Sequence, residues 1–216
     1  MPSVSFPRRV PLRALLGSTL RITVETSPAT AALRGPAVVV ANHASHLDAA
    51  LILTTLPAGL RKVKVGAASD YFFTTRWRAA LVTRFFAAFP VDRDGSGANR
   101  GVAAALLADG YTVVLFPEGT RSRDGTLGTF QPGAAALCVS QGMACVPVRI
   151  SGAYDAMPRG TRWPRKGRPP VTVRYGAPLW PAPDSAAHAF GGQLREAVRI
   201  LGEPGPAGRL RPKVAT

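Results

Sequence analysis

Two side chains that could perform acid-base chemistry, His43 and Asp48, stand five residues apart in the stretch Asn42-His-Ala-Ser-His-Leu-Asp48. Residues five apart lie roughly 140° apart around a helix and point to opposite faces of a strand, so these two can meet only across a loop. In such a loop a carboxylate holds a histidine ring in one tautomer and stabilises its protonated form. A structural alternative stays open, in which Asp48 caps the following helix and His43 fills the loop.

A second polar stretch, Pro117-Glu-Gly-Thr-Arg121-Ser-Arg123, directly follows an apolar run at 112–116. Pro117 keeps the residue before it extended, and Gly119 permits a close backbone approach to a ligand. Arginine presents a planar fork of donors that matches phosphate, and loop amides add fixed dipoles. The loop therefore predicts an anion site, with a solvated surface turn as the structural alternative.

Both polar stretches follow short apolar runs that predict buried strands, and each precedes a segment with helical character. Strands are expected at residues 21–25, 37–41, 62–66, 89–93, 112–116, 144–150 and 171–175. Helices are expected at 49–56, from after 70 to about 88, and at 98–108, 132–140 and 184–202. Strands and helices alternate along the chain, which predicts an α/β fold, a mixed sheet with flanking helices in a single domain.

The charge is strongly positive, with 27 Lys and Arg against 12 Asp and Glu and a formal net charge of +15. Such an excess indicates an anionic partner, which could be nucleic acid, a phospholipid surface or a phosphorylated substrate. No run reaches the ~20 apolar residues that span a bilayer, and no export signal follows Arg8 and Arg9. Cys138 and Cys145 are expected to be buried thiols in a reducing compartment.

The chain divides into a basic amphipathic segment at 1–21, a domain at 22–202 and a basic, disordered tail at 203–216. In the first segment Leu12, Leu15, Leu16 and Leu20 recur at helical spacing. A short helix there could rest on a membrane or pack against the domain, and the sequence leaves both interpretations open.

Two further stretches have the composition of a membrane interface. Phe73, Trp77, Leu81 and Phe85 form one stripe at four-residue steps with arginines beside it, a pattern that also suits ordinary core. Arg159, Arg162, Arg165, Lys166 and Arg168 surround Trp163 in one loop. Each basic residue near an anionic membrane adds roughly 1 kcal/mol, so this loop is either solvated or a patch for anionic headgroups.

Four stretches together resemble the glycerolipid acyltransferases, the family of 1-acylglycerol-3-phosphate acyltransferase. Asn42-His-Ala-Ser-His-Leu-Asp48 resembles the family's NHxxxxD block, and Val91-Asp-Arg93 resembles its second block. Phe116-Pro-Glu-Gly-Thr-Arg121 is similar to the third block and Val146-Pro-Val148 to the fourth, in the family order. The resemblance covers residues 22–180 approximately and implies the family's fold.

The resemblance implies direct transfer of a fatty acyl group to the free hydroxyl of a lysophospholipid, most simply 1-acylglycerol-3-phosphate, in phospholipid biosynthesis. The donor is acyl-CoA or acyl-carrier protein. His43 would be the general base that takes the hydroxyl proton, and Asp48 would orient the ring and stabilise the imidazolium. No covalent acyl-enzyme is required, so Ser45 is interpreted as a capping or loop residue.

The resemblance also implies a substrate-binding set. Arg93 and Arg121 would hold the acceptor phosphate, and Glu118 would position the glycerol end or brace its loop. Gly119 and Thr120 complete this loop, with backbone amides near Gly119 as candidate donors to the tetrahedral oxyanion. Many relatives carry lysine where this chain has Ala67-Ala-Ser-Asp70 and Gln131, so another lipid hydroxyl remains an alternative acceptor.

No cofactor and no metal are expected. The expected partners are the acyl donor, the lysophospholipid and an anionic membrane surface, with no nucleic acid, and the expected location is cytoplasmic, peripherally associated with the inner face of the cell membrane. Two other classes stay open. A metallohydrolase would use His43, His46 and Asp48 as ligands, and a basic membrane-binding module would have no catalysis.

Overall fold

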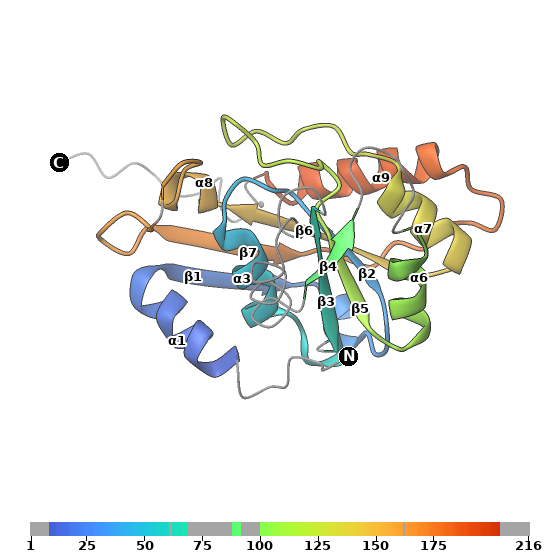
Figure 1. The fold of residues 1–216 in the computed structure, drawn as a ribbon, viewed down its shortest axis with the longest axis horizontal. Helices are drawn as coiled ribbons and strands as arrows, with labels where there is room; N and C mark the ends of the chain where they lie inside the picture. Colours follow the sequence, from blue (N-terminus) through green and yellow to red (C-terminus); the bar gives the residue numbers. More distant parts are fainter. Residues whose placement is uncertain (1–8, 61, 69–87, 92–99, 162, 204–216) are drawn as a thin grey trace.

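A computed structural model describes residues 9–60, 62–68, 88–91, 100–161 and 163–203, and within them a seven-stranded mixed sheet forms the centre of the fold (Figure 1). The strand order is β1-β7-β6-β2-β5-β3-β4. The strands are β1 (Arg21–Thr26), β2 (Val38–Ala41), β3 (Val63–Ala68), β4 (Ala88–Val91), β5 (Thr112–Leu115), β6 (Cys145–Ser151) and β7 (Pro170–Tyr175). The helices are α1 (Arg9–Thr19), α2 (Pro28–Ala32), α3 (Leu47–Thr55), α6 (Arg100–Ala108), α7 (Gly133–Gln141), α8 (Ala153–Ala156) and α9 (Ala187–Ile200), with a 3₁₀ turn η2 (Ala58–Leu60).

Strand direction determines which loops share an edge of the sheet. β6 and β7 pair antiparallel, whereas every other neighbouring pair is parallel. Strands β2 to β6 therefore all end at one edge, which we call the carboxyl edge, and β1 and β7 begin there. The loops after β2, β5 and β6 consequently lie together with the segments that lead into β1 and β7.

The sheet is covered on both faces, which explains why its central strands are almost wholly apolar. In β2, Val39 and Ala41 belong to one buried cluster and Val38 and Val40 to the other, as the two-residue period of a strand requires. Helices α1 and α3 lie over the first face, and α6, α7 and α9 over the second (Figure 1). The predicted α/β fold with flanking helices is confirmed.

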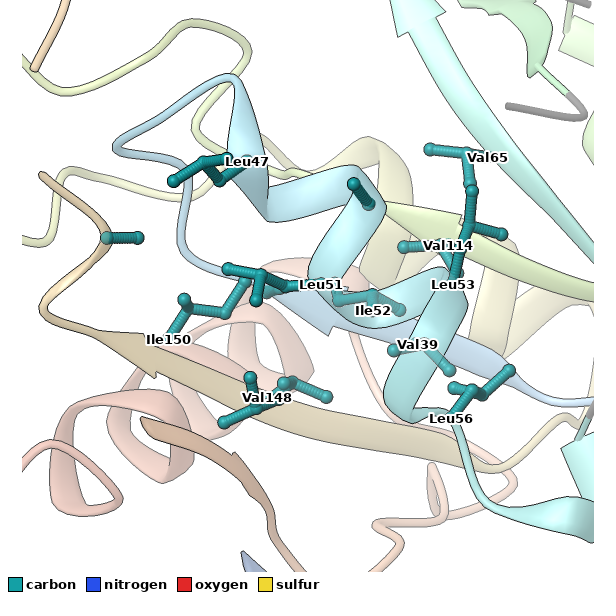
Figure 2. Close-up of a cluster of buried hydrophobic side chains, with 14 of the residues drawn as sticks. Val39, Leu47, Leu51, Ile52, Leu53, Leu56, Val65, Val114, Val148 and Ile150 are labelled. Carbon is teal, nitrogen blue, oxygen red and sulfur yellow. The ribbon is translucent and has the colours of Figure 1, made fainter. Parts of the chain in front are cut away.

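Helix α3 anchors the residues that follow β2, because its apolar side chains are buried against the sheet. Leu51 and Ile52 are fully buried and lie beside Val39, Val114 and strand β6 (Figure 2). Fully burying such a side chain is worth about 1.5–3 kcal/mol. The start of α3, where Asp48 sits in the first turn, is therefore held by tight packing.

The described part of the N-terminal amphipathic segment contains a helix, α1, that packs against the domain through α3. Leu16 and Leu20 are buried in the first cluster and Leu12 packs against it, whereas Leu15 is 53% exposed. One part of the apolar stripe thus belongs to the core, and Leu15 remains at the surface. None of the helices in the described ranges combines the length and apolar character needed to cross a bilayer.

Most elements lie within two or three residues of their predicted bounds. Helix α3 begins at Leu47, two residues before the expected start at 49, and the short helices α2 and α8 were not expected. Cys138 and Cys145 are buried free thiols, as predicted. The predicted helix after residue 70, with its aromatic stripe, and the tail beyond 203 lie outside the described residues, and the domain boundaries stay a prediction.

Candidate active site

His43 and Asp48 meet across the loop at the end of β2, as their spacing predicts. Nδ1 of His43 lies 2.8 Å from Oδ2 of Asp48. The His43 side chain is 23% exposed and the Asp48 side chain is 0% exposed. A buried carboxylate therefore faces one ring nitrogen of a histidine that retains contact with solvent.

All the hydrogen bonds described for the Asp48 carboxylate are accepted by one oxygen, Oδ2. The backbone N–H groups of Ala44 and Ser45 donate to Oδ2 of Asp48 at 2.7 and 2.8 Å, beside the bond from His43. Because Oδ2 already accepts two N–H groups, it acts as an acceptor toward the ring, and Nδ1 of His43 is the donor. Among the described residues, Oδ1 of Asp48 is buried with no hydrogen-bond partner. The tautomer protonated at Nδ1 leaves Nε2 to accept a proton.

Asn42 fixes the start of this loop to the neighbouring strand β6, a role that the sequence did not reveal. Its side-chain amide donates to the backbone oxygen of Ile150 at 3.0 Å, and its Oδ1 accepts from the Ile150 N–H at 2.7 Å. Asn42 is only 3% exposed. The amide replaces the main chain in the β2–β6 ladder one residue beyond Ala41 and so sets the position of His43.

We expect Asn42→Ala to lower the free energy of unfolding by about 2–6 kcal/mol, because it leaves two buried backbone groups of Ile150 unsatisfied at about 1–3 kcal/mol each. Urea unfolding of the wild type and the variant measures this difference. Asn42→Gln, which keeps the amide but moves it by one methylene, serves as a second variant. A loss below about 1 kcal/mol in Asn42→Ala would contradict the bridging role.

The other polar side chains of the stretch have distinct positions. The hydroxyl of Ser45 donates to the backbone oxygen of Met157 at 2.8 Å and accepts from the Leu47 N–H at 3.3 Å. These bonds match the interpretation of Ser45 as a capping or loop residue.

His46 is exposed. Its pKa is lowered by partial burial of the ring, then by the positive charge of Arg121 and then by His43. The positive charge of Arg121 therefore disfavours protonation of His46.

Glu118 braces the loop that carries His43. Its Oε1 accepts from the backbone N–H of His43 at 2.8 Å, and its Oε2 accepts from the N–H of Gly128 at 2.9 Å. A Cβ at position 128 would lie 2.9 Å from Oε2, so a larger residue there would require the carboxylate to move. Burial raises the pKa of Glu118 and outweighs the two backbone bonds that lower it. Of the two roles predicted for Glu118, these bonds support the brace.

The loop after β5 lies directly against His43. The Phe116 ring stacks on the imidazole with centroids 4.3 Å apart and planes 23° apart, and the N–H of Ser122 donates to the backbone oxygen of His43 at 2.8 Å. Gly119 has φ +70, a conformation that favours glycine. Its N–H donates to the backbone oxygen of Phe116 at 3.0 Å, so this amide is engaged within the turn.

Beside this loop lies a polar hollow of about 360 Å³. Its cationic lining comes from Arg121, Arg123 and Arg159, and its acidic lining from Glu118 and Asp124. The hydroxyl-bearing residues that line it are Thr120, Ser122, Thr126 and Thr129. The predicted substrate-binding residues Glu118, Thr120 and Arg121 thus gather at one cavity, and Arg159 joins them from the segment after α8.

The sequence predicted Arg159 to be part of a basic loop and did not predict it as a residue of the site. Its position follows from strand direction, since β6 ends at the carboxyl edge and α8 leads the chain back past the loop after β2. Arg93, the other predicted phosphate ligand, lies outside the described residues. Among the residues that the structure describes, no three His, Cys, Asp or Glu side chains are grouped to hold a metal ion.

The family comparison places the His43 and Arg121 loops within a known domain. A protein-family model described as Acyltransferase matches residues 21–151. A 1-acyl-sn-glycerol-3-phosphate acyltransferase from Limnanthes douglasii is 29% identical over 150 residues, which cover 66% of this chain and 50% of the relative. A chloroplastic enzyme of the same name from Arabidopsis thaliana is 34% identical over 131 residues, covering 58% of this chain and 35% of the relative. The chain spans about half the length, or less, of these curated relatives.

The fold also has a solved counterpart. The crystal structure of a 1-acyl-sn-glycerophosphate acyltransferase, PlsC, from Thermotoga maritima aligns with a TM-score of 0.71 and 24% sequence identity. The alignment covers 90% of this chain and 76% of that chain, and at this identity it establishes the fold. Since the family model spans more than half of the 216 residues and includes His43, Asp48 and Arg121, the chain belongs to the acyltransferase family.

Proposed function

We propose that this protein transfers a fatty acyl group from acyl-CoA or acyl-carrier protein to the free hydroxyl of a lysophospholipid, with 1-acylglycerol-3-phosphate as the acceptor. The reaction would belong to phospholipid biosynthesis. The family and the names of the relatives support the class of reaction. The observation that carries the proposal is the contact of 2.8 Å between His43 and the buried Asp48.

This contact supports a general-base mechanism. With the proton on Nδ1 directed at Asp48, Nε2 of His43 takes the hydroxyl proton of the acceptor as its oxygen attacks the thioester carbonyl. The carboxylate of Asp48 stabilises the imidazolium that forms. The proton then passes to the departing thiolate, so the acyl group moves directly between the two substrates.

The polar hollow supports a phosphorylated acceptor. Its arginines present donor forks suited to phosphate, and its loop contacts His43 through Phe116 and Ser122. An acceptor with its phosphate at Arg121 would therefore have its hydroxyl near the base. We extend the proposal to location, a cytoplasmic protein at the inner face of the cell membrane, because the lipid acceptor resides in a membrane and the net charge is +15.

Thioester turnover tests the proposal directly. The purified protein is given acyl-CoA or acyl-carrier protein together with a panel of lysophospholipids, and release of free thiol is followed while the lipid product is identified by mass spectrometry. Turnover that is fastest with 1-acylglycerol-3-phosphate is expected. Turnover confined to an acceptor without a phosphate would refute the acceptor assignment, and no acyl transfer with any acceptor would refute the function.

Arg121 should govern the affinity for the acceptor phosphate. Arg121→Ala is expected to raise the acceptor KM roughly 10- to 100-fold, the value of a hydrogen bond to a charged group, and to leave the donor KM nearly unchanged. Arg121→Lys should restore the affinity only in part, because lysine keeps the charge but loses the bidentate fork. Acceptor and donor KM are measured for all three proteins at low and high salt.

Arg34→Ala is the matched control, because Arg34 is exposed and precedes β2 at the opposite edge of the sheet. Bulk attraction is screened by salt, with a Debye length of about 8 Å near physiological ionic strength. An equal KM change in the Arg34 and Arg121 variants, or a lysine variant equal to the wild type, would reject the phosphate clamp.

A further inference from the structure

The segment from Pro158 to Pro169, which we call the basic loop, exposes cations and a tryptophan together. Arg159, Arg165 and Lys166 are exposed, and Trp163 is 75% exposed, more than any other large apolar side chain in the described residues. No acidic residue occurs between Asp155 and Asp184. Trp163 therefore gives the core almost nothing, and the charged residues near it in the sequence are all basic.

Backbone hydrogen bonds give the basic loop a defined shape. Near its start, the N–H and hydroxyl of Thr161 both donate to the backbone oxygen of Pro158, at 3.2 and 2.8 Å. Near its middle, the Arg165 N–H donates to the backbone oxygen of Ala156 at 2.8 Å. The Thr161 bonds close a turn within the loop, and the Arg165 bond ties the loop to the end of α8.

Arg168 fastens the other end of the basic loop to α1. Its guanidinium donates to the backbone oxygens of Gly17 and Leu20 at 2.7 and 3.4 Å. Its φ of 53 lies in the left-handed region that a non-glycine residue adopts only under constraint. Helix α1, with Leu15 exposed, thereby lies beside the basic loop (Figure 1).

The basic loop lies at the same edge of the sheet as the candidate active site. It leads into β7, which begins at the carboxyl edge, and Met157 just before it accepts the hydroxyl of Ser45. Arg159 lines the polar hollow with Arg121. A flat anionic surface that covered the basic loop would thus lie next to the hollow and to His43.

We propose that the basic loop is a docking surface for an anionic lipid bilayer, with Trp163 inserted at the headgroup level and Arg165 and Lys166 against the lipid phosphates. Tryptophan is enriched at membrane interfaces because its ring is apolar and its N–H is polar. Each basic residue near an anionic bilayer raises partitioning about fivefold. The purpose of this docking rests on the proposed function, because it delivers a membrane-resident acceptor to the hollow.

Vesicle binding without substrates tests the docking surface, so its failure is distinguishable from failure of acyl transfer. The full chain is sedimented with vesicles of phosphatidylcholine mixed with phosphatidylglycerol, and with phosphatidylcholine alone. Arg165→Gln combined with Lys166→Gln should weaken binding to the anionic vesicles about 30-fold. The control pair Arg34→Gln and Lys62→Gln removes the same charge at the opposite edge and should weaken binding far less. Equal losses in both pairs would overturn the proposal.

Tryptophan fluorescence provides a second readout with its own matched control. Trp180 is also exposed, at 62%, but it follows Leu179, which pairs with Cys145 at the start of β6 and so at the opposite edge. With Trp77 replaced by Phe in every protein compared, so that only Trp163 and Trp180 report, the blue shift of emission on adding anionic vesicles should disappear in Trp163→Phe and persist in Trp180→Phe. A shift that survives in Trp163→Phe, or one produced by single-stranded DNA and not by vesicles, would refute the bilayer as the partner.

Discussion

His43→Ala is expected to lower acyl transfer by about 10²–10⁴-fold, the usual contribution of a positioned general base. The loss should appear in kcat, because the imidazole takes a proton only as the bond to the thioester carbonyl forms. Release of free thiol from acyl-CoA in the presence of 1-acylglycerol-3-phosphate measures the effect. His43→Ala leaves a cavity where the ring was. Exogenous imidazole added to this variant is therefore expected to restore part of the acyl transfer activity.

The fold should survive this substitution. The variant loses the stacking of His43 on Phe116, which is worth about 0.5–1.5 kcal/mol, but Asp48 keeps its two backbone donors, Ala44 and Ser45. The carboxylate therefore remains hydrogen-bonded in its buried position. We expect the melting temperature to fall by a few degrees only, about 2–4 °C per kcal/mol in a chain of this size.

His46→Ala is the matched control. It removes an imidazole three residues after His43, and the His46 side chain is exposed. It should retain activity close to that of the wild type. Comparable activity in His43→Ala and the wild type would eliminate the general-base role. An equally large loss in His46→Ala would indicate that the loop as a whole, and not the His43 ring, is required.

The local features of the fold could be predicted from the sequence because they depend on neighbouring residues. The spacing of His43 and Asp48 excluded a shared helix or strand face, and the structure brings them together across a loop. Strand β2, which precedes them, is uniformly apolar because both faces of the sheet are covered, a property visible in residues 37–41. Gly110, just after α6, has φ +77, a left-handed conformation that glycine adopts without steric cost.

The long-range contacts could not be predicted, since their partners are distant in the chain. Asn42 binds Ile150, 108 residues away, and Glu118 binds the N–H of His43 across 75 residues. Which of these partners meet depends on strand order, and strand order is not encoded in the pattern of any single strand. For the same reason the sequence did not predict that Arg159 lines the hollow, because its position depends on where β6 ends.

Helix α1 illustrates a partial success. The spacing of its leucines predicted a helix, but not which leucines the domain would cover. The structure buries Leu16 and Leu20 in the first cluster and leaves Leu15 at the surface, an outcome that depends on how α1 packs against the domain. Helix α8 left no signal at all, because its four residues are too few to establish a periodicity.

Asp48→Asn is expected to lower kcat by roughly 10³–10⁴-fold, the scale seen when a histidine loses its carboxylate partner, with little change in acceptor KM. The geometry favours an asparagine whose side-chain oxygen occupies the present Oδ2 position, because three donors converge there: His43 Nδ1 and the N–H groups of Ala44 and Ser45. The ring would keep its orientation. The neutral amide cannot stabilise the imidazolium, so the loss arises from charge and not from position.

The substituted amide nitrogen would occupy the position of Oδ1, which is buried and has no hydrogen-bond partner among the described residues. Burying an unsatisfied NH₂ there should cost about 1–3 kcal/mol of unfolding free energy, so the variant should fold with a lower melting temperature. The measurements are kcat, acceptor KM and thermal unfolding for Asp48→Asn and for Asp48→Ala, which also strips the loop amides of their acceptor and should be the less stable variant. If Asp48→Asn were strongly destabilised while its folded fraction kept the wild-type kcat, Asp48 would serve only to hold the loop through Ala44 and Ser45, and the charge-stabilising role would be rejected.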